Sequence, residues 1–163
     1  MLQSTLKWIR LSESIVATTA YAVVAILLMI DVVGRELFAT TFLGNQQLAI
    51  YGAIVAGFFG LTLATSDNAH LRPEFMDFVG RNHEALFARV GDLISGLFFF
   101  AGAYVALTFV VISAEAGDRA PVLYFTLWPL QLVLPYAFAS AGVKHIIFAI
   151  QPGLKPATNG TGG

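Results

Sequence analysis

The sequence predicts an all-α integral membrane protein with four transmembrane helices, a short amphipathic interfacial helix between spans 2 and 3, and both termini in the cytoplasm. Hydrophobic residues make up 57% of the chain and charged residues only 12%, whereas a soluble domain carries about 25% charged residues. Four long stretches lack charge, and about 20 apolar residues in a helix cross a hydrocarbon core of about 30 Å. Apolar and polar residues do not alternate in these stretches, which argues against a membrane β-barrel.

The four stretches define a single membrane domain over residues 1–150. We expect its spans near residues 13–34, 46–66, 90–114 and 124–148. The first apolar run is longer than the hydrophobic region of a typical signal peptide, and no small-residue cleavage site follows it, so it is predicted to be retained. The tail from 151 to 163 is rich in Pro, Gly, Asn and Thr and is predicted to be disordered.

A polar turn interrupts the second charge-free stretch. It reads Gly44-Asn45-Gln46-Gln47, and we expect the second span to begin directly after it. Residues 37–43 then form a loop or a shallow re-entrant segment outside the span. The amides either cap the start of the helix or form hydrogen bonds to another helix, and the sequence does not decide between these two interpretations.

Basic residues orient the predicted spans. One side would hold seven Lys and Arg residues and the other side two, and the positive-inside rule assigns the richer side to the cytoplasm. The seven are Lys7, Arg10, Arg72, Arg81, Arg89, Lys144 and Lys155, and the two are Arg35 and Arg119. The net charge of −1 and the scattered basic residues give no sign of nucleic-acid binding.

The connection between spans two and three carries its own helical pattern. Apolar residues recur on one helix face at Leu71, Phe75, Phe78 and Val79. Pro73 and Glu74 suit the first turn of a helix, where the main chain lacks acceptors and carries partial positive charge. We predict an interfacial helix over about 71–82 that lies on membrane lipids or on a protein partner. His70, Arg72 and Glu74 lie at its start. The alternative is that its apolar face packs against the rest of this chain.

No residue pattern supports an enzyme or a cofactor site. The chain has no cysteine, and its three histidines lie at or beyond the expected span ends, where they cannot face each other as haem ligands. No Asp or Glu lies in the middle of an expected span, and Asp31, Asp92 and Glu115 are all close to span ends. A proton-coupled pump needs an acidic group inside the membrane, so a self-sufficient pump is disfavoured.

Two remaining features suggest helix docking. Asp31 and Arg35 lie four residues apart on one helix face, where they either neutralise each other or contact a partner. Gly52, Ala56, Gly60 and Ala64 form a small-residue stripe along the second span, which permits close approach of another helix.

Three segments resemble the small permease subunit of TRAP (tripartite ATP-independent periplasmic) transporters, the DctQ family. They are DVVGRELF (31–38), NAHLRPEF (68–75) and PVLYFTLWP (121–129), and their order and spacing cover roughly residues 10–150. Gln46 and Gln47 stand where the family often has a glutamate, so an amide hydrogen bond would replace a salt bridge there.

The resemblance implies a non-catalytic subunit without cofactors in a bacterial cytoplasmic (inner) membrane. A large permease subunit would bind the substrate and the sodium ions, and a periplasmic substrate-binding protein would deliver an organic acid anion. This chain would brace the large subunit. The expected subunit-interface residues are Asp31, Arg35, Gln46, Gln47, Gly52, Ala56, Gly60, His70, Arg72 and Glu74. A stand-alone homo-oligomeric transporter and a membrane anchor of a redox complex remain as alternatives.

Overall fold

The computed structural model describes residues 2–40, 43–66 and 84–154. Its elements are α1 (Leu2–Phe38), α2 (Asn45–Ser66), α4 (Glu84–Ala116), α5 (Trp128–Gln131), α6 (Val133–Ile150) and the 3-10 turn η1 (Pro152–Leu154). Four helical segments are long and apolar enough to cross a membrane, which confirms the predicted all-helical class with four apolar spans. The predicted interfacial helix, together with His70, Arg72 and Glu74, lies outside the described residues. So does most of the predicted tail, although its first residues form η1.

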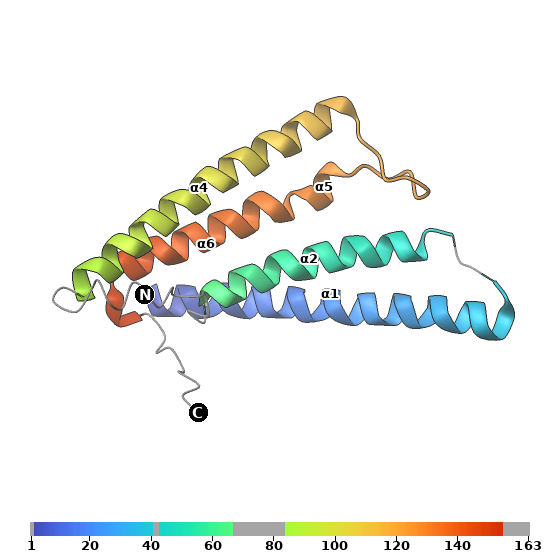
Figure 1. The fold of residues 1–163 in the computed structure, drawn as a ribbon, viewed down its shortest axis with the longest axis horizontal. Coiled ribbons are helices and arrows are strands. Elements are labelled where there is room, and N and C mark those ends of the chain that lie inside the picture. Colours follow the sequence, from blue (N-terminus) through green and yellow to red (C-terminus); the bar gives the residue numbers. More distant parts are fainter. Residues whose placement is uncertain (1, 41–42, 67–83, 155–163) are drawn as a thin grey trace.

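The long helices lie in a row rather than in a closed bundle. α2 packs between α1 and α6, and α6 packs between α2 and α4 (Figure 1). The pair α1–α2 and the pair α6–α4 converge at one end and spread apart at the other. We call the converging end, where α1 begins and α6 ends, the terminal end. The opposite end, where α1 ends and α2 begins, is called the loop end.

The first helix is much longer than a membrane span. It contains 37 residues, which at 1.5 Å per residue is about 55 Å. It begins well before the expected start near residue 13, because residues 2–12 include no Gly or Pro and favour helix throughout. It ends where Ala39 adopts a left-handed conformation, with φ of 48°. The Thr40 amide then donates to the Gly34 carbonyl at 3.1 Å, a typical helix C-terminal closure.

The fourth span begins at Trp128, later than the expected start near residue 124. The preceding residues cannot be helical, because Val122 and Tyr124 have φ values of 69° and 55°. Pro129 occupies the first turn of α5, where a missing N–H costs nothing. A break at Leu132 separates α5 from α6. Pro135 accounts for this break, because it has no N–H to donate to the carbonyl four residues earlier.

Small residues bring the helices of each pair together. A Cβ placed on Gly52 of α2 would lie 2.6 Å from Cγ2 of Val24 on α1. A Cβ on Gly96 of α4 would lie 2.8 Å from Cδ1 of Ile146 on α6. A side chain at either position would push its neighbour aside, so glycine favours the close approach and the dense packing that hold helices together in lipid.

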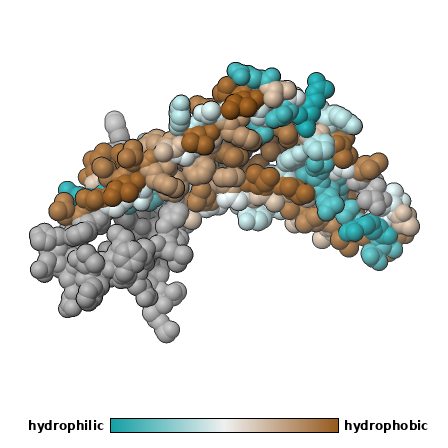
Figure 2. Space-filling model, turned by 45° about the horizontal axis from the view of Figure 1, so that its top comes forward, coloured by the Kyte–Doolittle hydropathy of each residue, from teal (hydrophilic) through white to brown (hydrophobic). Residues whose placement is uncertain are grey.

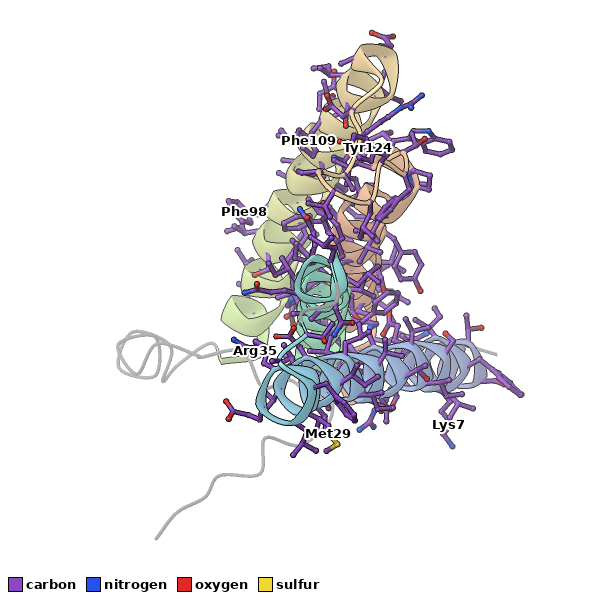
Figure 3. All side chains as sticks on the ribbon, turned by 90° about the vertical axis from the view of Figure 1, so that its right-hand side faces the viewer. Lys7, Met29, Arg35, Phe98, Phe109 and Tyr124 are labelled. Atoms are coloured by element: carbon purple, nitrogen blue, oxygen red, sulfur yellow. The ribbon has the colours of Figure 1, made fainter. Side chains whose placement is uncertain are left out.

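Aromatic rings connect the two pairs along α2 and α6. Phe58 and Phe138 form an edge contact at 6.1 Å, and Phe59 and Tyr136 lie 5.5 Å apart. The outer surface is strongly hydrophobic along the helix lengths, and hydrophilic residues gather at the loop end (Figure 2). Phe98 of α4 projects outward from the row and is 73% exposed (Figure 3). This distribution fits a lipid-facing exterior.

Candidate functional site

A buried ion pair connects α1 to α6 at the terminal end. Lys144 Nζ lies 2.5 Å from Glu13 Oε2, and the two side chains are 1% and 0% exposed. The second carboxylate oxygen of Glu13 accepts a hydrogen bond from the Ser140 hydroxyl at 2.5 Å. Lys144 also donates to the main-chain carbonyl of Thr62 on α2, at 2.8 Å. Three of the four long helices therefore meet at this pair.

The helix periodicity explains why these side chains face inward. On α6 the buried residues Ala137, Ala141, Lys144 and Phe148 recur at intervals of three and four, so the lysine belongs to the packed face. A charged group inside a membrane protein is costly unless it is paired and hydrogen-bonded. The carboxylate, the hydroxyl and the carbonyl meet that requirement for the Lys144 ammonium group and its partner.

A second buried polar pair connects α4 to α6. His145 Nδ1 lies 3.2 Å from Asp92 Oδ1, and both side chains are about nine-tenths buried. The ring of Phe99 stacks on the imidazole, with centroids 5.4 Å apart and planes inclined by 12°. Consecutive residues of α6 thus contact different helices, because Lys144 reaches α1 and His145 reaches α4. The two pairs connect α1 and α4 to α6 at the terminal end.

At the loop end, Asp31 and Arg35 form the ion pair that their spacing predicts. The distance from Arg35 Nη2 to Asp31 Oδ2 is 3.1 Å. The aspartate side chain is 11% exposed, whereas the arginine side chain is 56% exposed. Figure 3, viewed from this end, labels Arg35 on a different side of α1 from Met29. The pair neutralises itself within α1, and the guanidinium keeps an exposed surface.

The amide turn serves a contact between helices. Asn45 is buried, and its Nδ2 donates to the main-chain carbonyl of Leu27 on α1 at 2.6 Å. Of the two interpretations of this turn, the structure therefore supports the cross-helix hydrogen bond for Asn45. Gln46 is exposed and Gln47 is half-buried.

The small-residue stripe of α2 is used in part within the chain itself. Gly52 packs against α1, and Ala56 is completely buried. Gly60, further along the stripe, has open space where a Cβ would be. Gly60 and Ala64, in the terminal-end half of the stripe, are half-buried, while the loop-end half holds α1 and α2 together.

Sequence reasoning missed the four residues of the two buried pairs as a group. Glu13 and Asp92 were placed at the starts of expected spans, and Lys144 and His145 near the end of the last. A usable signal existed in α6, because a lysine and a histidine interrupt an otherwise apolar helical face before that helix ends. An ionisable residue in such a position indicates a buried partner.

Comparison with known families assigns most of the chain to a transporter family. The model of the family described as "Tripartite ATP-independent periplasmic transporters, DctQ component" matches residues 24–152, which is well over half of the chain. The matched region includes the Asp31–Arg35 pair and all of α2, α4 and α6. No curated protein matches the sequence.

Proposed function

Because the chain belongs to the DctQ component family of tripartite ATP-independent periplasmic transporters, a family of non-catalytic membrane subunits, we propose that it braces the large permease subunit of an importer for organic acid anions. The large subunit would bind the substrate and the coupling sodium ions. A periplasmic substrate-binding protein would deliver the anion. This chain would hold the static part of the large subunit in place while its transport domain moves.

The open row of helices is the observation that supports a bracing role best. Among the described residues, the edge helices α1 and α4 pack mainly against one long neighbour each, α2 and α6 respectively, although Glu13 of α1 also reaches α6. A row offers a long face to a partner, whereas a closed bundle would present only its outside to lipid. Gly60 adds a point on α2 where a partner helix could approach closely.

The buried charges also fit a scaffold better than a pump. A proton-coupled pump keeps a membrane carboxylate available for cycles of protonation. Here Glu13 is bound by Lys144 and Ser140, and Asp92 is bound by His145. Both carboxylates hold helices together, so neither is available for cycles of protonation.

We further propose that the terminal end faces the cytoplasm of a bacterium and that the loop end faces the periplasm. The imbalance of basic residues supports this orientation. The segment of about 71–82 would then lie on the cytoplasmic surface as an interfacial helix, with His70, Arg72 and Glu74 positioned to contact membrane lipids or the large subunit.

We propose that the candidate interface residues with accessible surface contact the large permease subunit directly. Arg35 and Gln46 are exposed in the structure, and Gln47 and Gly60 are half-buried. Asp31 would act by orienting Arg35. Gly52 and Ala56 would act indirectly, because they set the position of α2 against α1.

The proposal is tested by co-purification. The tagged chain is expressed with a candidate large permease subunit, a longer many-span protein sought in the neighbouring reading frames, and the two are purified together in detergent. We expect Arg35→Ala and His70→Ala each to reduce the recovered large subunit while circular dichroism shows unchanged helix content. Arg119→Ala is the matched control, because Arg119 is also an exposed arginine at the loop end. Recovery equal to the native chain in both variants would remove these residues from the interface.

A further inference from the structure

The connection between α4 and α5, residues 117–127, forms a short hairpin. The Ala120 amide donates to the Phe125 carbonyl at 2.8 Å, next to an antiparallel bridge between Arg119 and Thr126. These main-chain contacts pair the two arms of the connection. The hairpin therefore has a defined shape of its own, although it carries no helix and only this one bridge.

Two side chains of the hairpin contact the start of α2. Leu123 and Phe125 are both half-buried. A Cβ placed on Gly44, the residue before α2, would lie 2.6 Å from Cδ2 of Leu123, so the leucine lies directly against that glycine. The rings of Phe125 and Tyr51 meet edge to face, with centroids 5.6 Å apart. The hairpin therefore connects the α4–α6 pair to the α1–α2 pair.

This contact lies where the two helix pairs spread apart, at the loop end (Figure 1). At the terminal end the pairs are joined by Lys144 of α6, which bonds the carboxylate of Glu13 on α1 and the carbonyl of Thr62 on α2. The hairpin joins the same two pairs at the opposite end of the row. Without it, the pairs would be free to pivot about the contacts nearer the terminal end.

The turn of the hairpin is strained. Val122 and Tyr124 have φ values of 69° and 55°, a left-handed conformation that is unfavourable for residues with a Cβ and most of all for a β-branched one. Their side chains are exposed on either side of Leu123, which lies against Gly44. Strain of this kind persists only where surrounding contacts enforce it. Separation of the hairpin from α2 would remove those contacts and release part of the strain.

We propose that the hairpin is a latch that sets the spread of the two helix pairs. In the closed state Leu123 and Phe125 rest on the start of α2, and the row is fixed at both ends. In the open state the hairpin leaves α2, its turn relaxes, and the loop ends of the pairs move while the terminal end stays joined. The latch acts within this chain and does not depend on the bracing role. Where the chain does brace a large subunit, the latch decides whether the face it offers is stiff.

Distances between spin labels measure the spread in the purified full chain. The chain has no cysteine, so Gln46→Cys with Glu115→Cys places labels at two exposed loop-end positions, one on α2 and one on α4. Lys7→Cys with Arg89→Cys does the same near the terminal end, on α1 and α4. The helices extend about 25 Å from the terminal-end ion pair to the loop end at 1.5 Å per residue, so a pivot of about 10° moves the loop ends by about 4 Å. Double electron–electron resonance in nanodiscs resolves such a change.

We expect a narrow distribution of loop-end distances for the native hairpin. Leu123→Ala with Phe125→Ala should broaden or shift that distribution by about 4 Å or more and leave the terminal-end distances unchanged. Tyr51→Ala removes the α2 side of the same contact and should have the same effect, with the hairpin sequence intact. The matched control is Tyr124→Ala with Thr126→Ala, which alters two exposed side chains of the same hairpin and should keep the distribution narrow.

Three results would overturn the latch. The first is an unchanged loop-end distribution in Tyr51→Ala, which decides the matter even if circular dichroism shows that the double hairpin variant loses helix. The second is equal broadening in the matched control, because the spread would then not depend on the contact with α2. The third is broadening at both ends of the row, because the pairs would then not pivot about the terminal end. The large subunit is absent from these samples, so failure of the latch is distinct from failure of the bracing role, which co-purification measures.

Discussion

Removal of the lysine from the Glu13–Lys144 pair should destabilise the protein strongly. In Lys144→Met the aliphatic length is kept, but the ammonium group and its bonds to the carboxylate and to the Thr62 carbonyl are lost. Hydrogen bonds to charged groups contribute about 1.5–3 kcal/mol each. Removal of one partner from a buried ion pair costs about 3–5 kcal/mol, because the other charge is left buried without compensation. We therefore expect a loss of about 3–5 kcal/mol in the free energy of unfolding.

The double variant distinguishes this explanation from simple loss of packing. Glu13→Leu should cost a similar amount alone, because it leaves the Lys144 ammonium buried without its carboxylate. Glu13→Leu combined with Lys144→Met removes both charges, and it should cost much less than the sum of the two single changes. The Ser140 hydroxyl, which loses its acceptor, is able to bond a carbonyl of its own helix.

An exchanged pair gives a sharper version of the same test. Glu13→Lys with Lys144→Glu would restore opposite charges, but it would place a carboxylate against the Thr62 carbonyl, which needs a donor. We expect the exchanged pair to remain destabilised.

The assay is unfolding of the purified chain by titration with a denaturing detergent, followed by circular dichroism. A loss of less than about 1 kcal/mol in the free energy of unfolding of Lys144→Met, well under the cost of an unpaired buried charge, would show that the ion pair does not stabilise the protein in this way. Additive costs in the double variant would contradict this role of the pair as well, because the two side chains would then contribute independently.

Two further predictions concern the contacts within each helix pair. Asn45→Ala should lower the free energy of unfolding by about 0.5–1.5 kcal/mol, because it removes one cross-helix hydrogen bond whose carbonyl acceptor lies within α1. Gln46→Ala, at the exposed neighbouring position, should be neutral in the same unfolding titration, and equal losses in the two variants would contradict the role given to Asn45. Gly96→Leu should lower the free energy of unfolding by about 1–3 kcal/mol, because the larger side chain overpacks against α6. Thermal unfolding measures this loss as a lower melting temperature. Gly57→Leu, where the structure has open space, should leave the melting temperature unchanged or raise it, and a comparable drop at both positions would show that the glycine contact in α4 is not the cause.

The spans were predictable because hydropathy and length are local properties of the sequence. Each apolar run is long enough to identify its helix without knowledge of its neighbours. The residues at which the helices begin and end were less predictable. The first residues of α1 mix polar and apolar side chains, so their hydropathy does not indicate a membrane span, although they favour helix. The start of the fourth span depends on the left-handed conformations of Val122 and Tyr124, which no local propensity indicates for such residues.

The buried polar pairs were not predictable because they are tertiary. Glu13 and Lys144 lie 131 positions apart in the chain, and each stands near the end of an expected span, where charged residues are ordinary. The Asp31–Arg35 pair was predictable because both members lie on one helix at a spacing of four. The role of Gly52 was partly predictable: the stripe indicated a close helix contact, but only the structure identifies α1 as the helix it contacts.

Solute uptake by reconstituted vesicles tests the bracing role most directly. Vesicles that contain this chain alone, the large permease subunit alone, or both together are supplied with a sodium gradient, the substrate-binding protein and a labelled organic acid anion. We expect uptake only when the large subunit is present, and we expect it to decrease when this chain is omitted from the complex. Sodium-dependent uptake by this chain alone would contradict a non-catalytic bracing role.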